Sequence, residues 1–249
     1  MRARRQVLRV LGGMALGTSV AIAGIAPVTA ADRYQQDVAR RADFVAQTNF
    51  VQCVGASLQM MINMIEPGRN RSAKEQLRLQ KLARKLSPPR RDGSIRQGAS
   101  VRGWVQVLRR EVDQPYRLVG ADSLNTAVKM AARAIDRTGA PVGLLVWRGR
   151  HAWVMSGFTS TKPLSRGGKV TSVTIYDPLY PYGDDFWGPS PRPGVPISIK
   201  ALGRQFVPRR TNNTSNRFQT TLQQAYPTLS GKYVLVMPYR PYSPVRRPA

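Results

Sequence analysis

The chain has 249 residues, with 39 Lys and Arg against 13 Asp and Glu, one His, one Cys and 42% hydrophobic residues, which is typical of a globular protein rather than a disordered one. Glycine and proline follow no fixed period, so collagen-like and low-complexity classes are excluded. The single Cys excludes a disulfide framework and Cys-rich metal sites, and the single His excludes two-His metal motifs. The length fits one domain of roughly 200 residues beside a short targeting segment.

Residues 1–30 have the pattern of an export signal. Four arginines and no acid precede an apolar stretch over residues 10–27, and the small residues before Ala30 fit cleavage after it. The sequence RRQVLR at 4–9 is similar to the twin-arginine export pattern, and both this route and the general secretory route stay open. We expect cleavage rather than a retained anchor, because about eighteen weakly apolar residues lie at the lower limit for a spanning helix. The protein is therefore expected to be secreted or associated with the cell envelope.

The mature chain is strongly cationic. Removing residues 1–30 takes away four arginines and no acid, which leaves 35 basic and 13 acidic residues and a net charge of +22. This charge favours anionic surface polymers or lipids as partners. The basic residues are dispersed and accompany no zinc finger, RNA-binding signature or basic zipper, so no specific nucleic-acid site is expected. The alternative is a solvated basic surface with no dedicated polyanion site.

Residues 31–46 are polar and predict a short helix or an arm, and the following part of the chain predicts four helices. The helices are expected over residues 54–65, 72–86, 100–111 and 123–137. The first carries a buried apolar stripe and has Cys53 in its first turn. The second is basic and amphipathic, and four leucines form its apolar side: Leu77, Leu79, Leu82 and Leu86.

The back half of the chain changes period and predicts strands. These are expected over residues 142–147, 152–158, 170–176 and 232–237. Residues 178–217 are rich in Pro, Gly, Tyr and Asn and are expected to be mostly loop, with a short strand around Ile197 and Ile199. Aromatic residues of this segment either line a cleft or cover the core: Tyr180, Tyr182, Phe186 and Trp187. Helices followed by strands predict an α+β fold.

Cys53 has two interpretations. In an exported protein it has no intramolecular disulfide partner, so the thiol is either a structural residue of the core or is kept for its reactivity. Its predicted position at a helix N-terminus favours the second interpretation, because unpaired N–H groups and the helix dipole stabilise a thiolate there.

His151 and Asp177 are predicted to meet at one edge of the sheet. If residues 152–158 and 170–176 pair as an antiparallel hairpin, the start of the first strand lies opposite the end of the second. An imidazole held by a carboxylate can take the proton of a thiol nucleophile. The alternatives are a half-exposed histidine of a strand and a strand-ending turn at Asp177. Gln47, six residues before Cys53, carries an amide that can stabilise an oxyanion together with the backbone N–H of the nucleophile.

Three stretches of the sequence together resemble papain-superfamily cysteine peptidases. They are QTNFVQCVGASL at 47–58, PVGLLVW followed by HAWVMSGF within 141–158, and YDP at 176–178. The group that they resemble is that of the bacteriocin-leader (double-glycine) peptidases, whose catalytic order is Gln, Cys, His, Asp. The similarity covers roughly residues 44–180.

This resemblance implies a papain-like fold and a role for each matching residue. Cys53 is implied as the nucleophile, His151 as the general base and acid, Asp177 as the orienting acid and Gln47 as an oxyanion-hole residue. The sequence departs from the family pattern at Val54, where the family usually has Gly directly after the Cys. The transporter segments and phosphate-binding loop of leader peptidases are also missing from the sequence, so export-coupled leader processing is not implied.

We therefore expect an exported cysteine hydrolase that cleaves peptide or cell-envelope amide bonds through an acyl-enzyme, with no metal or organic cofactor. Two alternatives stay open: a catalytically silent, basic envelope-binding module of the same fold, and an acyl transferase such as a transglutaminase-like enzyme. The expected organisation is a signal at 1–30, an arm at 31–43, a peptidase-like domain at 44–240 and a flexible tail at 241–249, in a monomer.

Overall fold

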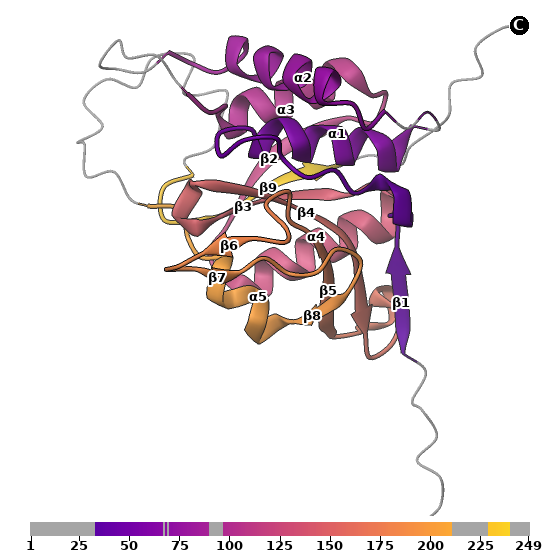
Figure 1. Ribbon diagram of the computed structural model, residues 1–249. Helices are drawn as coiled ribbons and strands as arrows, with labels where there is room; N and C mark the ends of the chain where they lie inside the picture. Colours follow the sequence, from indigo (N-terminus) through magenta and orange to yellow (C-terminus); the bar gives the residue numbers. More distant parts are fainter. Residues whose placement is uncertain (1–32, 67, 69, 90–96, 211–228, 240–249) are drawn as a thin grey trace, which may run out of the picture. The chain divides into compact units, whose positions relative to one another are not determined.

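The computed structural model describes residues 33–66, 68, 70–89, 97–210 and 229–239 (Figure 1). The predicted signal at 1–30 and the predicted tail at 241–249 lie outside the described residues, as does the end of the predicted loop at 211–217. Among the described residues, no helix has both the length and the apolar character needed to cross a membrane.

An antiparallel sheet of seven strands forms the centre of the described domain. Six strands follow the order β2-β9-β3-β4-β5-β8, and β1 pairs with the far half of β4, beyond the part that pairs with β3. The strands are β1 (Tyr34–Asp37), β2 (Tyr116–Ala121), β3 (Val142–Val146), β4 (His151–Ser160), β5 (Val170–Tyr176), β8 (Pro196–Ser198) and β9 (Tyr233–Pro238). A separate small ribbon pairs β6 (Gly183–Asp184) with β7 (Gly188–Pro189).

Helices cover both faces of the sheet (Figure 1). One face carries α1 (Cys53–Ile65), α2 (Ala73–Lys85) and α3 (Val101–Glu111), and the other carries α4 (Leu124–Thr138) and α5 (Ile199–Gln205). The short 3-10 helices are η1 (Arg41–Asp43), η2 (Trp147–Gly149) and η3 (Leu164–Arg166). Each face of the sheet encloses its own hydrophobic core. The α+β class predicted from the sequence is therefore confirmed.

The four predicted helices and four predicted strands are all present, with ends that differ by one or two residues. Serine side chains account for three of the helix starts, because Ser72, Ser100 and Ser123 each accept a backbone N–H of the first turn. Gly139 ends α4 with φ +63°, a left-handed conformation that glycine adopts without a steric penalty. Capping chemistry is local, which is why the sequence located these boundaries well.

The predicted order of helices first and strands afterwards is wrong. Strands β1 and β2 lie in the front half of the chain, and α5 lies in the segment that was predicted to be mostly loop. β1 is short and polar and pairs with residues 157–160 of β4, and β2 pairs with β9, which is more than a hundred residues away. Residues 34–37 thus form part of the sheet rather than an arm outside it. Ile197 lies in β8 as predicted, but Ile199 begins α5.

The predicted apolar side of α2 also needs a correction. Leu79 is buried, but Leu77 is 41% exposed. The buried residues of this helix are Gln76, Leu79, Gln80 and Ala83. Two glutamines thus occupy inward positions because each binds backbone groups of a neighbouring segment.

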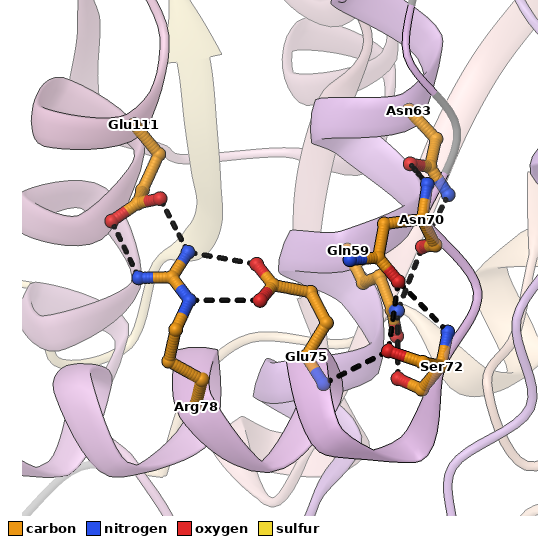
Figure 2. A network of polar contacts seen from close by, with 7 residues as sticks. All are labelled: Gln59, Asn63, Asn70, Ser72, Glu75, Arg78 and Glu111. Carbon is orange, nitrogen blue, oxygen red and sulfur yellow. Dashed lines mark hydrogen bonds and ion pairs between the residues drawn. The ribbon is translucent and has the colours of Figure 1, made fainter.

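Two buried amide side chains of α1 hold the connection to α2 (Figure 2). Asn63 donates to the carbonyl oxygen of Asn70 at 3.2 Å and accepts the N–H of Asn70 at 3.1 Å. Gln59 donates to the carbonyl oxygens of Asn70 and Ser72 at 2.7 and 3.1 Å. The start of α2 is therefore anchored to the side of α1.

Arg78 links α2 to α3 on the outer side of the helical layer (Figure 2). Its guanidinium group binds Glu75 at 2.7 Å and Glu111 at 2.5 Å. Hydrogen bonds to these two carboxylates raise the pKa of Arg78 further above its already high value. Because Arg78 is about half exposed, we expect this ion-pair network to orient the helices more than to stabilise them.

Replacing Gly103 with Ala is expected to destabilise the fold, because α2 and α3 touch there. A Cβ atom on Gly103 would lie 2.1 Å from the backbone oxygen of Ala83 and 2.6 Å from Oγ of Ser87. The clash should outweigh the better helix propensity of Ala and lower the free energy of unfolding by about 2 kcal/mol. Urea denaturation measures this loss. The control is Gly98→Ala, whose Cβ would meet only the oxygen of Val51 at 3.8 Å, and an equal loss in both variants would contradict the explanation.

Candidate active site

Cys53 is the first residue of α1, and two buried glutamines of α2 hold the chain that leads to it. Gln76 accepts the N–H of Thr48 and donates to the oxygen of Ala46, both at 2.9 Å. Gln80 donates to the oxygen of Val51 and accepts the N–H of Gly55, both at 2.9 Å. These four bonds fix the loop on both sides of Cys53. Neither glutamine was predicted from the sequence, where the only signal was an amide on the inward side of a charged helix.

Gly55 lets α1 approach α2 closely beside Cys53. A Cβ atom at this position would lie 2.9 Å from both the backbone oxygen of Gln76 and Cβ of Gln80. Val54, which stands where the peptidase pattern usually has glycine, is buried and packs in the core under α1. The close contact in this chain therefore requires glycine two residues after the Cys rather than one.

The first turn of α1 also contacts β4 next to His151. The hydroxyl of Ser57, one turn after Cys53, donates to the oxygen of Ala152 at 3.2 Å. His151 is the first residue of β4, is 4% exposed and lies close enough to Cys53 for this residue to raise the pKa of the imidazole. The helix N-terminus and the strand start thus meet at the Cys and the His.

Asp177 reaches His151 as the predicted hairpin requires. β4 and β5 pair antiparallel, with Val154 opposite Tyr176, and Asp177 directly follows β5. The Nε2–H of His151 donates to Oδ1 of Asp177 at 2.6 Å. The same oxygen accepts the N–H of Leu179 at 2.8 Å, and Asp177 is fully buried. The carboxylate therefore fixes the orientation of the imidazole ring by accepting the hydrogen bond of its Nε2 nitrogen.

Burial and charge act on His151 in opposite directions. Burial lowers its pKa, but the hydrogen bond to Asp177, the interaction with Cys53 and the negative charges of both groups outweigh burial and raise the pKa to about 9. A raised pKa means that the imidazolium form is favoured when both partners carry negative charge. The arrangement therefore suits a thiolate next to a protonated histidine.

Trp147 covers a face of the His151 ring. The two ring centroids are 4.2 Å apart and the rings are stacked within 22°. The indole N–H donates to Oε1 of Gln205 at 2.9 Å, and the amide of Gln205 donates to the oxygen of Pro189 at 3.0 Å. An aromatic face beside an imidazolium stabilises its positive charge. Trp147 and Gln205 are 58 residues apart, and no sequence pattern joined them to the site.

A backbone hydrogen bond places Gln47 near the other predicted site residues. Its N–H donates to the oxygen of Pro178 at 2.7 Å, which places it beside the residue that follows Asp177. Its side-chain NH₂ donates to the oxygen of Asn49 at 3.0 Å. Among the described residues, the buried Oε1 of Gln47 has no hydrogen-bond partner. The structure thus brings Gln47 to the same region as Cys53, His151 and Asp177, and its oxyanion role stays a prediction.

The described part of the chain holds no group of three or more His, Cys, Asp and Glu side chains arranged to bind a metal ion. No protein-family model matches the chain, and no curated protein matches it significantly.

Proposed function

We propose that the protein is a cysteine hydrolase that cleaves peptide or amide bonds through a Cys53–His151–Asp177 triad. The observation that carries the proposal is the contact between three elements: the N-terminus of α1, the start of β4 and the end of β5. The chain has one Cys and one His, and the fold brings Cys53 close enough to His151 to raise the pKa of the imidazole. A buried structural thiol would not need a histidine that a buried carboxylate orients.

The proposed reaction has two steps. In the first, the Cys53 thiolate attacks the carbonyl carbon of the substrate, His151 gives its proton to the leaving amine, and a thioester forms on Cys53. In the second, His151 takes a proton from water, the resulting hydroxide attacks the thioester, and the carboxylic acid leaves. His151 then holds the proton again and Cys53 is again a thiolate. Asp177 holds the orientation of the ring in both steps and stabilises the imidazolium whenever His151 carries the proton.

Backbone groups of the first turn of α1 fit the role of oxyanion donors. The N–H of Gly55 is bound by Gln80, and the N–H of Ala56 by the oxygen of Gln52. Within the described residues, the N–H groups of Cys53 and Val54 have no acceptor. Such donors beside a nucleophile can stabilise the negative charge of a tetrahedral intermediate. We include Gln47 as a further donor, through the second hydrogen of its amide.

The helix-start cysteine that packs against an antiparallel sheet carrying His and Asp also supports a papain-like fold, which we propose together with the function. We further propose that the protein acts outside the membrane, on the basis of the predicted signal at residues 1–30.

A peptide-cleavage assay tests the proposed function. The mature protein is incubated with a complex peptide mixture, and new termini are identified by mass spectrometry, with Cys53→Ala as the matched inactive control. We expect cleavage products with the parent protein only, and a covalent acyl adduct on Cys53 after acid quenching.

Two other outcomes would contradict the hydrolase. Incorporation of added amines into peptides without new termini would indicate an acyl transferase. No products and no adduct, together with salt-sensitive binding of a polyanion that Cys53→Ser leaves unchanged, would indicate a silent binding module.

A further inference from the structure

Arginines gather at the turn that leads into His151. The β3–β4 hairpin turns through residues 147–150, and Arg148 and Arg150 are both exposed there. The segment that follows α5 lies against this turn, because the N–H of Arg210 donates to the oxygen of Arg148 at 3.2 Å. Arg209 lies over Gly149, whose added Cβ would be 3.1 Å from Cγ of Arg209. Arg148 and Arg150 thus lie within three residues of His151 in the chain, and Arg209 and Arg210 contact the same turn.

The turn keeps an uncommon backbone conformation. Trp147 and Arg148 both have φ +54°, and Gly149 follows with φ +97°. Two successive non-glycine residues in the left-handed region are rare and cost energy, and such positions are enriched at functional sites. The contacts that hold the turn are the Trp147 indole on Gln205, the N–H of Arg150 on the oxygen of Val146, and the bond from Arg210. These hydrogen bonds therefore fix the backbone that carries Arg148 and Arg150.

The positive charge of this turn is not balanced within the described chain. Arg148, Arg150 and Arg210 form no ion pair with any described acidic residue. Arg78, by contrast, is exposed to a similar degree and is bound by two carboxylates. Guanidinium groups without internal partners attract carboxylates from outside, and the fork of donors in Arg binds them in a bidentate manner.

We propose that Arg148, Arg150 and Arg210, which we call the arginine turn, form a subsite for a carboxylate of the substrate, next to the Cys53–His151 pair. This inference rests on the proposed function and specifies its substrate class: peptides or amides with an acidic group close to the bond that is cleaved. The arginine turn attracts the acidic substrate and holds it beside the thiolate. It takes no part in bond making or breaking.

Two alkylating reagents of nearly equal size test the subsite. Iodoacetate carries a carboxylate and iodoacetamide is neutral. Both alkylate the sulfur of Cys53 through their methylene carbon, with loss of iodide. Because the chain has one Cys, the ratio of the two rates reports the local electrostatic attraction of a carboxylate. We expect the variant Arg148→Gln/Arg150→Gln/Arg210→Gln to lower the iodoacetate-to-iodoacetamide ratio about three- to tenfold at low salt. The rate with iodoacetamide alone should change less than twofold.

A control variant removes the same amount of charge elsewhere. Lys129, Arg133 and Arg137 are exposed on α4, which covers the face of the sheet opposite α1. Their triple replacement with Gln should leave the ratio unchanged. An equal decrease in both variants, or no decrease in the arginine-turn variant, would overturn the subsite. Thermal unfolding of both variants checks that each is folded, and the single variant Arg150→Gln replaces the triple variant if that one is not.

The substrate class is tested by competition. A short peptide with two Glu residues should slow the alkylation of Cys53 by iodoacetamide, and the same peptide with Gln should not. The arginine-turn variant should lose this difference, and equal protection by both peptides would overturn the acidic class. If the arginine-turn variant lowers the iodoacetate-to-iodoacetamide ratio but replacing His151 does not slow alkylation of Cys53, the subsite is supported and the proposed hydrolase is contradicted. If replacing His151 slows alkylation of Cys53 but the arginine-turn variant leaves the ratio unchanged, the hydrolase is supported and the subsite is contradicted.

Discussion

Replacing His151 with Ala should lower the rate of Cys53 alkylation by iodoacetamide at pH 6 by about ten- to a hundredfold. A thiol with the ordinary pKa of about 8.5 is only about 0.3% thiolate at this pH, and iodoacetamide reacts with the thiolate. In the native protein, His151 has a pKa of about 9 and keeps its positive charge at pH 6, next to Cys53. The imidazolium therefore favours the reactive form of its neighbour, and its removal takes this support away.

The measurement is direct because the protein has a single thiol. Mass spectrometry counts one adduct, and its rate is followed from pH 4 to pH 9 in both proteins. The same two proteins in urea serve as the control and should react equally, because the unfolded chain separates Cys53 from His151. Equal rates of the folded proteins at pH 6 would contradict the pair and with it the proposed hydrolase.

Replacing Asp177 with Asn should lower the pKa of His151 well below its value of about 9. Burial lowers the pKa of this histidine, and the hydrogen bond to Asp177 is the largest of the causes that raise it. Asn keeps the size of the side chain and an oxygen for the N–H of Leu179, so the fold should persist. The loss of carboxylate charge should also lower hydrolysis by up to about 10⁴-fold, as in other triads.

A proton NMR titration gives the pKa without ambiguity, because the chain has only one histidine. Asp136→Asn is the matched control, since Asp136 lies in α4 and binds Tyr34 rather than His151. This control should leave the pKa of His151 unchanged. A pKa above 8 in the Asp177 variant would mean that Asp177 does not hold the imidazolium.

The raised pKa of His151 also makes the stability of the fold depend on pH in a defined direction. The pKa of His151 is higher in the folded protein than the 6.5 of an unfolded chain, so protonation favours folding. The stabilisation, on the order of 3 kcal/mol, is fully present below pH 6.5 and is lost as the pH rises to about 9. We expect the free energy of unfolding to fall across this window in the parent protein, beyond any change seen with Asp177→Asn.

Much of the local structure could be predicted from the sequence. Serine caps, the glycine that ends α4 and the apolar period of α1 depend on neighbours a few residues away. The hairpin between β4 and β5 is also local, and its geometry was enough to bring His151 to Asp177. The two scarce residues, Cys53 and His151, drew attention because each occurs once.

Other parts could not be predicted, because their partners are distant in the chain. β1 is short and polar, and β2 is a six-residue apolar segment; each pairs with a strand that is more than a hundred residues away, β4 or β9. Gln76 and Gln80 belong to a charged helix, and their hydrogen-bond partners lie in the distant loop around Cys53. The stacking of Trp147 on His151 depends on Gln205, and the arginine turn depends on the segment after α5.

The α+β class, the main helices and strands, and the pairing of His151 with Asp177 could all be predicted from the sequence, since they follow from periodicity, helix caps and a short hairpin. The assembled fold was needed to show that α1 brings Cys53 close to His151, that Gln205 binds the Trp147 indole that covers the ring, and that Arg210 contacts Arg148 in the turn before His151. Such contacts join segments that are tens to about a hundred residues apart, and burial and hydrogen bonding select them only when the whole sheet and its helices are assembled.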